Sequence, residues 1–141
     1  MVITKVILLI VLSFLEFLVD VKMSKECKTC KGIVMLFFHH IISVMIFVGG
    51  LLFNPVYHLL LCVIVLLHWF TNGRCEITVW TNRECGYDES RRFNDTLNMS
   101  GLWKLDNRLI YVALLFVIGY DVWYILNNRG SLSWNPLKRI K

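Results

Sequence analysis

The stretch IISVMIFVGGLLFNPVYHLLLCVIVLLHWF, residues 41–70, decides the fold, because its apolar run is broken at Asn54-Pro55. Proline lacks a backbone N–H and restricts the residue before it, so one helix ends at this point and another begins. The break therefore predicts a tight helical hairpin with antiparallel helices at 33–53 and 56–70. Both helices come close to the roughly 17–25 apolar residues that a membrane crossing needs.

Two more apolar runs lie outside this hairpin, at 3–19 and 109–126, and 57% of the 141 residues are hydrophobic. Together the four runs predict a single all-α membrane domain (1–141), an integral membrane protein with about four transmembrane helices. A polar loop (71–108) and a basic tail (127–141) complete the chain. A signal peptide is the competing interpretation of 3–19, but no small-residue cleavage site follows, so we expect a retained helix.

The charge pattern leaves the membrane orientation open. With four spans, the loops 20–32 and 71–108 share one side and carry ten Lys and Arg, while the terminal side carries five. Counting net charge reverses the preference, so the positive-inside rule does not decide. The chain's net charge of +5 indicates contact with lipid headgroups, not nucleic acid. The tail residues expected at the headgroups are Arg129, Trp134, Lys138, Arg139 and Lys141.

Polar residues inside the spans are the next candidates. His40 and His68 lie fourteen residues before and after Asn54, so the hairpin predicts a cluster at equal depth. Polar groups in a bilayer are costly unless paired, and we interpret these residues as interhelical packing contacts. Asp121 is expected to meet His58 or a tyrosine such as Tyr57. The predicted packing residues are Glu16, His39, His40, His58, His68 and Asp121, with Trp69 beside the histidine cluster.

A bound cofactor is the sharper alternative for the histidines. Haem or a metal ion would be held by His39 or His40 together with His68. Haem-binding bundles more often present histidine pairs at two depths, whereas this spacing predicts one cluster. We therefore predict no cofactor, no metal site and no catalytic residue.

Four cysteines form two pairs on one side of the predicted bundle: Cys27 and Cys30, then Cys75 and Cys85. This layout resembles that of bacterial disulfide-generating quinone reductases, which makes a membrane thiol–disulfide oxidoreductase the alternative function. The arginine that usually follows the helix-end pair in that family is absent here. The spacing is unusual for zinc. Structural disulfides or free thiols are favoured, and Cys62, in mid-membrane, is expected to be an inert small hydrophobe.

The segment after the third span shows helical periodicity. Residues His68, Asn72, Cys75, Thr78, Asn82 and Cys85 follow one another in steps of three and four, which predicts that the third helix continues past Gly73 as an interfacial helix. Two glycosylation sequons, at Asn94 and Asn98, weakly favour a lumenal loop.

Residues 38–86 resemble a group of small multipass proteins encoded by large DNA viruses of algae and other protists. The resemblance is carried by His39-His40, His58, His68-Trp69, Thr71-Asn72, Cys75, Thr78, Asn82 and Cys85. It implies a structural, non-enzymatic component of a virion membrane, or a minor capsid protein linking bilayer and shell. The implied partners are the lipid bilayer and capsid or other virion membrane proteins, with a homo-oligomer as an open alternative. Before assembly the protein is expected in internal host membranes.

Overall fold

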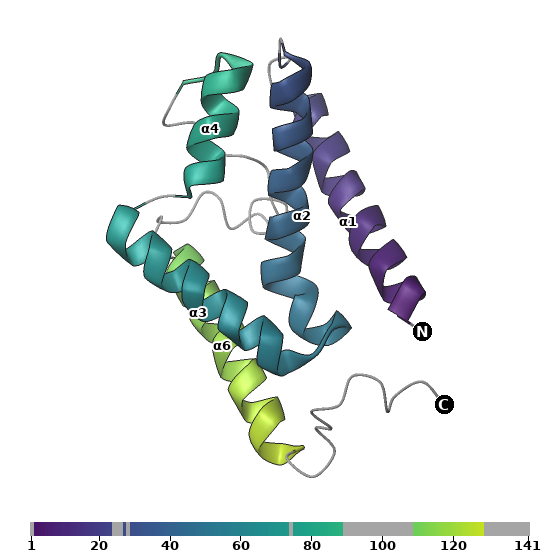
Figure 1. The fold of residues 1–141 in the computed structure, drawn as a ribbon, viewed down its shortest axis with the longest axis vertical. Helices are drawn as coiled ribbons and strands as arrows, with labels where there is room; N and C mark the ends of the chain where they lie inside the picture. The colour runs from purple at the N-terminus through teal and green to yellow at the C-terminus, as the bar shows by residue number, and fades with distance from the viewer. Residues whose placement is uncertain (1, 24–26, 28, 74, 89–108, 129–141) are drawn as a thin grey trace.

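The structure, a computed structural model, describes residues 2–23, 27, 29–73, 75–88 and 109–128 (Figure 1). Within these residues all regular secondary structure is helical: α1 (Val2–Met23), α2 (Cys30–Leu52), α3 (Pro55–Asn72), α4 (Glu76–Cys85) and α6 (Leu109–Asn127). By length and composition, α1, α2, α3 and α6 suit a membrane crossing. The predicted all-α architecture with four candidate spans is confirmed.

The turn between α2 and α3 forms at the predicted residues. The backbone N–H of Phe53 donates to the Gly49 carbonyl over 2.8 Å and closes α2. The Asn54 side chain accepts a hydrogen bond from the Val56 N–H over 2.9 Å, which caps the start of α3. Pro55 occupies the first turn of α3, where its missing N–H costs nothing.

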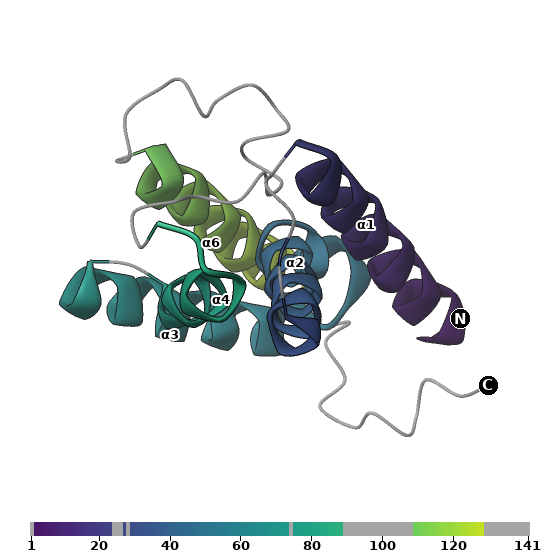
Figure 2. The ribbon, with the colours of Figure 1, turned by 90° about the horizontal axis from the view of Figure 1, so that it is seen from above.

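The two hairpin helices diverge beyond this turn. Figure 2 views α2 nearly along its axis while α3 lies across the view. Helices α1 and α4 both pack against α2, whereas α3 packs against α6. Helix α2 is therefore the central element. Helix α1 runs alongside it, α4 packs near its N-terminal end, and α3 and α6 pack near its C-terminal end (Figure 1).

Gly73 ends α3, so the prediction of one continuous helix through Cys85 was wrong. Gly73 adopts the left-handed conformation (φ 70°), and its N–H donates to the Trp69 carbonyl over 2.8 Å. Glycine takes this conformation without a Cβ clash, which makes it a common helix terminator. The separate helix α4 then starts at Glu76 and ends before Gly86, which is also left-handed (φ 68°).

Several sequence predictions lie outside the described residues. These are the two sequons at Asn94 and Asn98 and the basic tail residues Arg129, Trp134, Lys138, Arg139 and Lys141. Where the chain is described, two apolar clusters form the core. One joins α2, α3 and α6 through Ile46, Cys62, Trp69 and Leu114, and the other joins α1 and α2 through Leu9, Val44 and Leu52.

Candidate functional site

Helices α2, α3 and α6 meet at a buried group that we call the His58 cluster: His58, Cys62 and Asp121. His58 and Cys62 lie one helical turn apart on α3, and Asp121 comes from α6. The three residues expose at most 2% of their surface. His58 Nδ1 lies 2.6 Å from Asp121 Oδ2, which confirms the predicted His58–Asp121 contact. The Cys62 sulfur lies 3.6 Å from His58 Nε2.

The hydrogen bonds of His58 define where its protons lie. Nε2 is 2.9 Å from the Met45 carbonyl oxygen and 3.1 Å from that of Ile46. Carbonyl oxygens only accept, so Nε2 carries a hydrogen and donates it. Nδ1 and the Asp121 carboxylate then share one further proton between them. The pair has no net charge whether the shared proton lies on Nδ1 or on the carboxylate, which suits a low-dielectric environment.

Two consecutive glycines of α2 make room for this pair. A Cβ at Gly49 would lie 2.7 Å from His58 Cδ2, and a Cβ at Gly50 would lie 2.5 Å from Asp121 Oδ1. Any side chain at these positions would displace the imidazole or the carboxylate. The Gly49-Gly50 pair therefore allows α2 to approach α3 and α6 at the point where they cross.

A second buried group, the His40 cluster, lies between α1 and α2. His40 Nδ1 is 3.5 Å from Glu16 Oε2, and His40 Nε2 is 3.5 Å from Asp20 Oδ2. Glu16 and Asp20 lie one turn apart on α1, so both carboxylates reach the same imidazole. Asp20 was missed from the sequence because the first span was expected to end at residue 19. Its spacing of four from Glu16 was the available signal.

The predicted grouping of His39, His40, His68 and Trp69 is divided among separate contacts. His39 Nδ1 lies 3.5 Å from the Thr78 hydroxyl on α4. The His68 imidazole contacts Asn72 on its own helix, with 3.1 Å between His68 Nδ1 and Asn72 Nδ2. The buried Trp69 ring meets Tyr111 of α6 edge to face. The prediction that residues equidistant from Asn54 form one cluster was wrong for His68 and Trp69, because α3 turns away from α2.

A disulfide links the start of α2 to the end of α4. It joins Cys27 to Cys85, so the bond connects one member of each predicted cysteine pair. Cys30 and Cys75 are free thiols, the first exposed and the second partly buried. Cys62 is also free and fully buried, as predicted, although its neighbour is an imidazole as well as apolar side chains.

Polar contacts reinforce this junction, which we call the α4 head (27 and 29–32 with 76–85). The Thr29 hydroxyl donates to the Glu84 carbonyl over 2.8 Å and accepts from the Gly32 N–H over 3.0 Å. Lys31 forms an ion pair with the Glu84 carboxylate. A Cβ at Gly32 would lie 2.5 Å from the Cys27 sulfur, so the disulfide packs directly on the α2 backbone.

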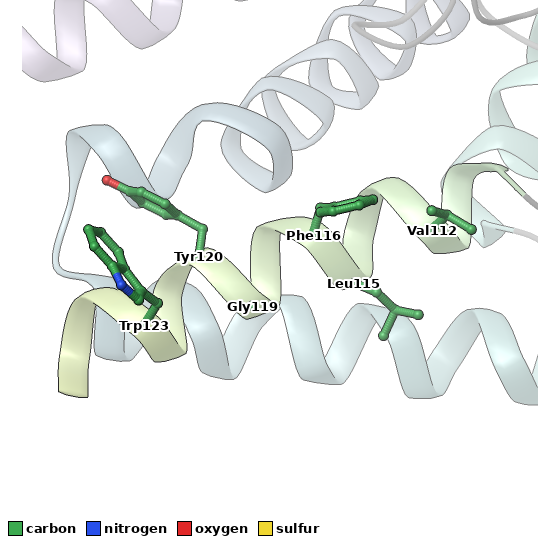
Figure 3. A pocket seen from close by; sticks show the side chains of 6 residues that line it. All are labelled: Val112, Leu115, Phe116, Gly119, Tyr120 and Trp123. Carbon is green, nitrogen blue, oxygen red and sulfur yellow. The ribbon is translucent and has the colours of Figure 1, made fainter. Parts of the chain in front are cut away.

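Helix α6 also carries an open apolar groove on its surface (Figure 3). No charged side chain is among its lining residues, which are Val112, Leu115, Phe116, Gly119, Tyr120 and Trp123. Phe116 is 77% exposed and Trp123 is 59% exposed. Such a surface suits contact with lipid chains or with another apolar helix.

Comparisons with known proteins identify no relative of the chain. No protein family, curated protein or solved structure matches the chain. The function is therefore argued from the geometry of the two buried clusters and of the α4 head.

Proposed function

We propose that the chain is a structural protein of a membrane, a rigid helical scaffold without enzymatic activity. The observation that carries this proposal is the position of its buried polar groups. His58 and Asp121 join α3 to α6, while Glu16, Asp20 and His40 join α1 to α2. Charged groups inside a membrane are expensive, and pairing them between helices both satisfies them and fixes the helices relative to one another.

The outer surfaces of these helices support the same proposal. Large apolar side chains are exposed along α1, α3 and α6, among them Ile7, Leu15, Ile64, Leu67 and Phe116. In water these would favour aggregation, whereas lipid chains or apolar partner helices solvate them. In a scaffold of this kind the polar groups pair with one another inside the bundle, and the apolar surface faces the bilayer.

The α4 head provides a surface of different character. Three connections tie α4 to the start of α2: the Cys27–Cys85 disulfide, the Thr29 hydrogen bond and the Lys31–Glu84 ion pair. Helix α4 is less apolar than the four spans, and Trp80 is 53% exposed. A short, firmly attached helix at the membrane boundary is suited to contacting another protein.

The membrane in question, in this proposal, is the internal bilayer of a large icosahedral DNA virus. The support is the resemblance of residues 38–86, combined with what those residues do. His40, His58, Trp69, Asn82 and Cys85 are all buried, and Thr78 contacts His39. Several residues of the shared pattern therefore pack inside the protein, which supports a structural role. Capsid or other virion membrane proteins are the proposed partners.

Particle fractionation tests this proposal. Intact virions are treated with protease to remove surface-bound material, and the protein is then quantified against a host membrane protein as the contamination control. We expect it to co-purify with protected particles and to be released with the internal lipid by detergent. Depletion in parallel with the host control would refute a virion role.

A second candidate function, thiol–disulfide exchange, is favoured by one observation. Cys30 is an exposed free thiol at the first residue of α2, three residues from the disulfide-bonded Cys27. Its thiolate could attack the Cys27 sulfur, forming a Cys27–Cys30 bond and releasing Cys85 as a thiolate. Each client disulfide formed would reduce this cysteine pair by two electrons, which a quinone-class acceptor would have to remove. Replacing Cys30 with serine should abolish disulfide formation in client proteins if this reaction matters. Unchanged client oxidation would eliminate it.

A further inference from the structure

The His58 cluster has the composition of a transition-metal site. One nitrogen of His58, the sulfur of Cys62 and a carboxylate oxygen of Asp121 all lie within 4.8 Å of one another. Imidazole, thiolate and carboxylate are the three side-chain ligand types that Zn²⁺ accepts. Two of the residues share one face of α3 and the third comes from α6, so a bound ion would bridge two helices.

The imidazole is already oriented for this role. Nε2 donates to the carbonyls of Met45 and Ile46, which leaves Nδ1 directed at Asp121. Metal-bound histidines usually donate their other ring N–H to a carbonyl or carboxylate, which fixes both the tautomer and the ring. The α2 backbone supplies that second contact without using any side chain.

The Asp121 carboxylate has a second oxygen that is available to coordinate an ion. Oδ2 contacts His58, whereas Oδ1 is buried and has no hydrogen-bond partner. A buried acceptor without a donor is costly, and a cation would satisfy it. The unpartnered Oδ1 is therefore a second observation that points to a ligand, in addition to the clustering of the three side chains.

We infer that His58 Nδ1, Cys62 Sγ and Asp121 bind one divalent transition-metal ion of the zinc class. Tetrahedral coordination with metal–ligand bonds of about 2.0–2.3 Å separates ligand atoms by roughly 3.3–3.6 Å. The present Nδ1–Oδ2 separation is 2.6 Å and the Nδ1–Sγ separation is 4.0 Å. The Cys62 sulfur now lies nearer to Nε2, at 3.6 Å, than to Nδ1. Binding therefore requires the carboxylate to withdraw slightly and the sulfur to move toward Nδ1. A fourth position remains for water or another oxygen ligand.

Charge balance favours this exchange within the spans. Without metal, the imidazole–carboxylate pair is neutral and the thiol is protonated. A divalent ion displaces the shared proton and the thiol proton, while the Nε2 hydrogen stays in place. Two positive charges enter and two leave, so the cluster is neutral before and after binding.

Cobalt binding to the purified full chain in detergent tests the site, with Co²⁺ as a spectroscopic substitute for Zn²⁺. We expect one ion per chain, a thiolate-to-cobalt charge-transfer band and the visible bands of tetrahedral cobalt. Cys62→Ala should lower the affinity by at least about ten-fold, since even outer contacts of metal ligands contribute about 10–100-fold. The double variant Cys30→Ser with Cys75→Ser removes the other free thiols and should bind like the wild type.

Each outcome bears on the inference. Helical content measured by circular dichroism shows whether Cys62→Ala retains its fold, and Zn²⁺ should raise the melting temperature of the wild type but not of this variant. An intact wild-type chain that binds no Co²⁺ would overturn the site. So would equal binding by Cys62→Ala, or a charge-transfer band that disappears in the Cys30/Cys75 variant.

Discussion

Gly50→Ala is the most demanding perturbation of the α2–α3–α6 crossing, because it adds a single methyl group. That carbon would lie 2.5 Å from Asp121 Oδ1 and 2.9 Å from His58 Nδ1. Both atoms belong to the same buried pair, so the pair must separate or α2 must move. Breaking a buried ion pair costs about 3–5 kcal/mol, whereas Gly→Ala inside a helix contributes about 1 kcal/mol of stability. We expect a net loss of about 2–4 kcal/mol, from the difference of these two terms.

Gly119→Ala is the matched control, since Gly119 lies within a candidate span and its Cβ would meet nothing within 4 Å. It should be neutral or stabilising by up to about 1 kcal/mol. The assay is reversible unfolding in mixed micelles, with tryptophan fluorescence as the signal and free energies compared between variants. Equal stability of the two variants would refute the argument that α2 packs directly on the buried pair.

Three further changes have defined outcomes. Asp121→Asn should be tolerated and Asp121→Leu should lose about 1–3 kcal/mol by leaving the imidazole unpaired; equal losses, measured as assembly yield and unfolding free energy, would contradict a packing role. Cys27→Ser removes the bond to Cys85, whose separation of 58 residues gives a loss of about 4 kcal/mol by loop-closure entropy. Cys30→Ser is its control, and unchanged melting of both variants would argue against the bond. His40→Leu strands two buried carboxylates of α1 and should cost about 3–5 kcal/mol in the same unfolding assay, whereas a neutral result would mean that they are solvated.

Sequence reasoning succeeded where covalent geometry limits the chain. The Asn54-Pro55 turn follows from the chemistry of proline, and four apolar runs of sufficient length predict four candidate spans. The His58–Asp121 contact was predicted because both residues lie near the same end of their helices and neither is stable alone in an apolar environment.

The failures share a physical origin. Distance from the Asn54 turn gives the depth of a residue but not the direction in which its helix departs. We attribute that direction to Gly49 and Gly50, which leave room for His58 beside α2. This tertiary effect is not visible in the periodicity of the sequence. The disulfide pairing was open for a similar reason, because four cysteines allow three connectivities and only the packing of α4 on α2 selects one.

The Cys27–Cys85 bond has a consequence for the topology of the chain. Disulfides persist in oxidising compartments and are rare where glutathione keeps thiols reduced. The bond therefore predicts that the end of the bundle with the α4 head faces an oxidising lumen or exterior, a point that the count of lysines and arginines left open. The Asn54 turn is then expected on the opposite side of the membrane. Cys30, the first residue of α2, is a free thiol at the same end as the α4 head, so an oxidising compartment closes only the pair that the packing of α4 on α2 brings together.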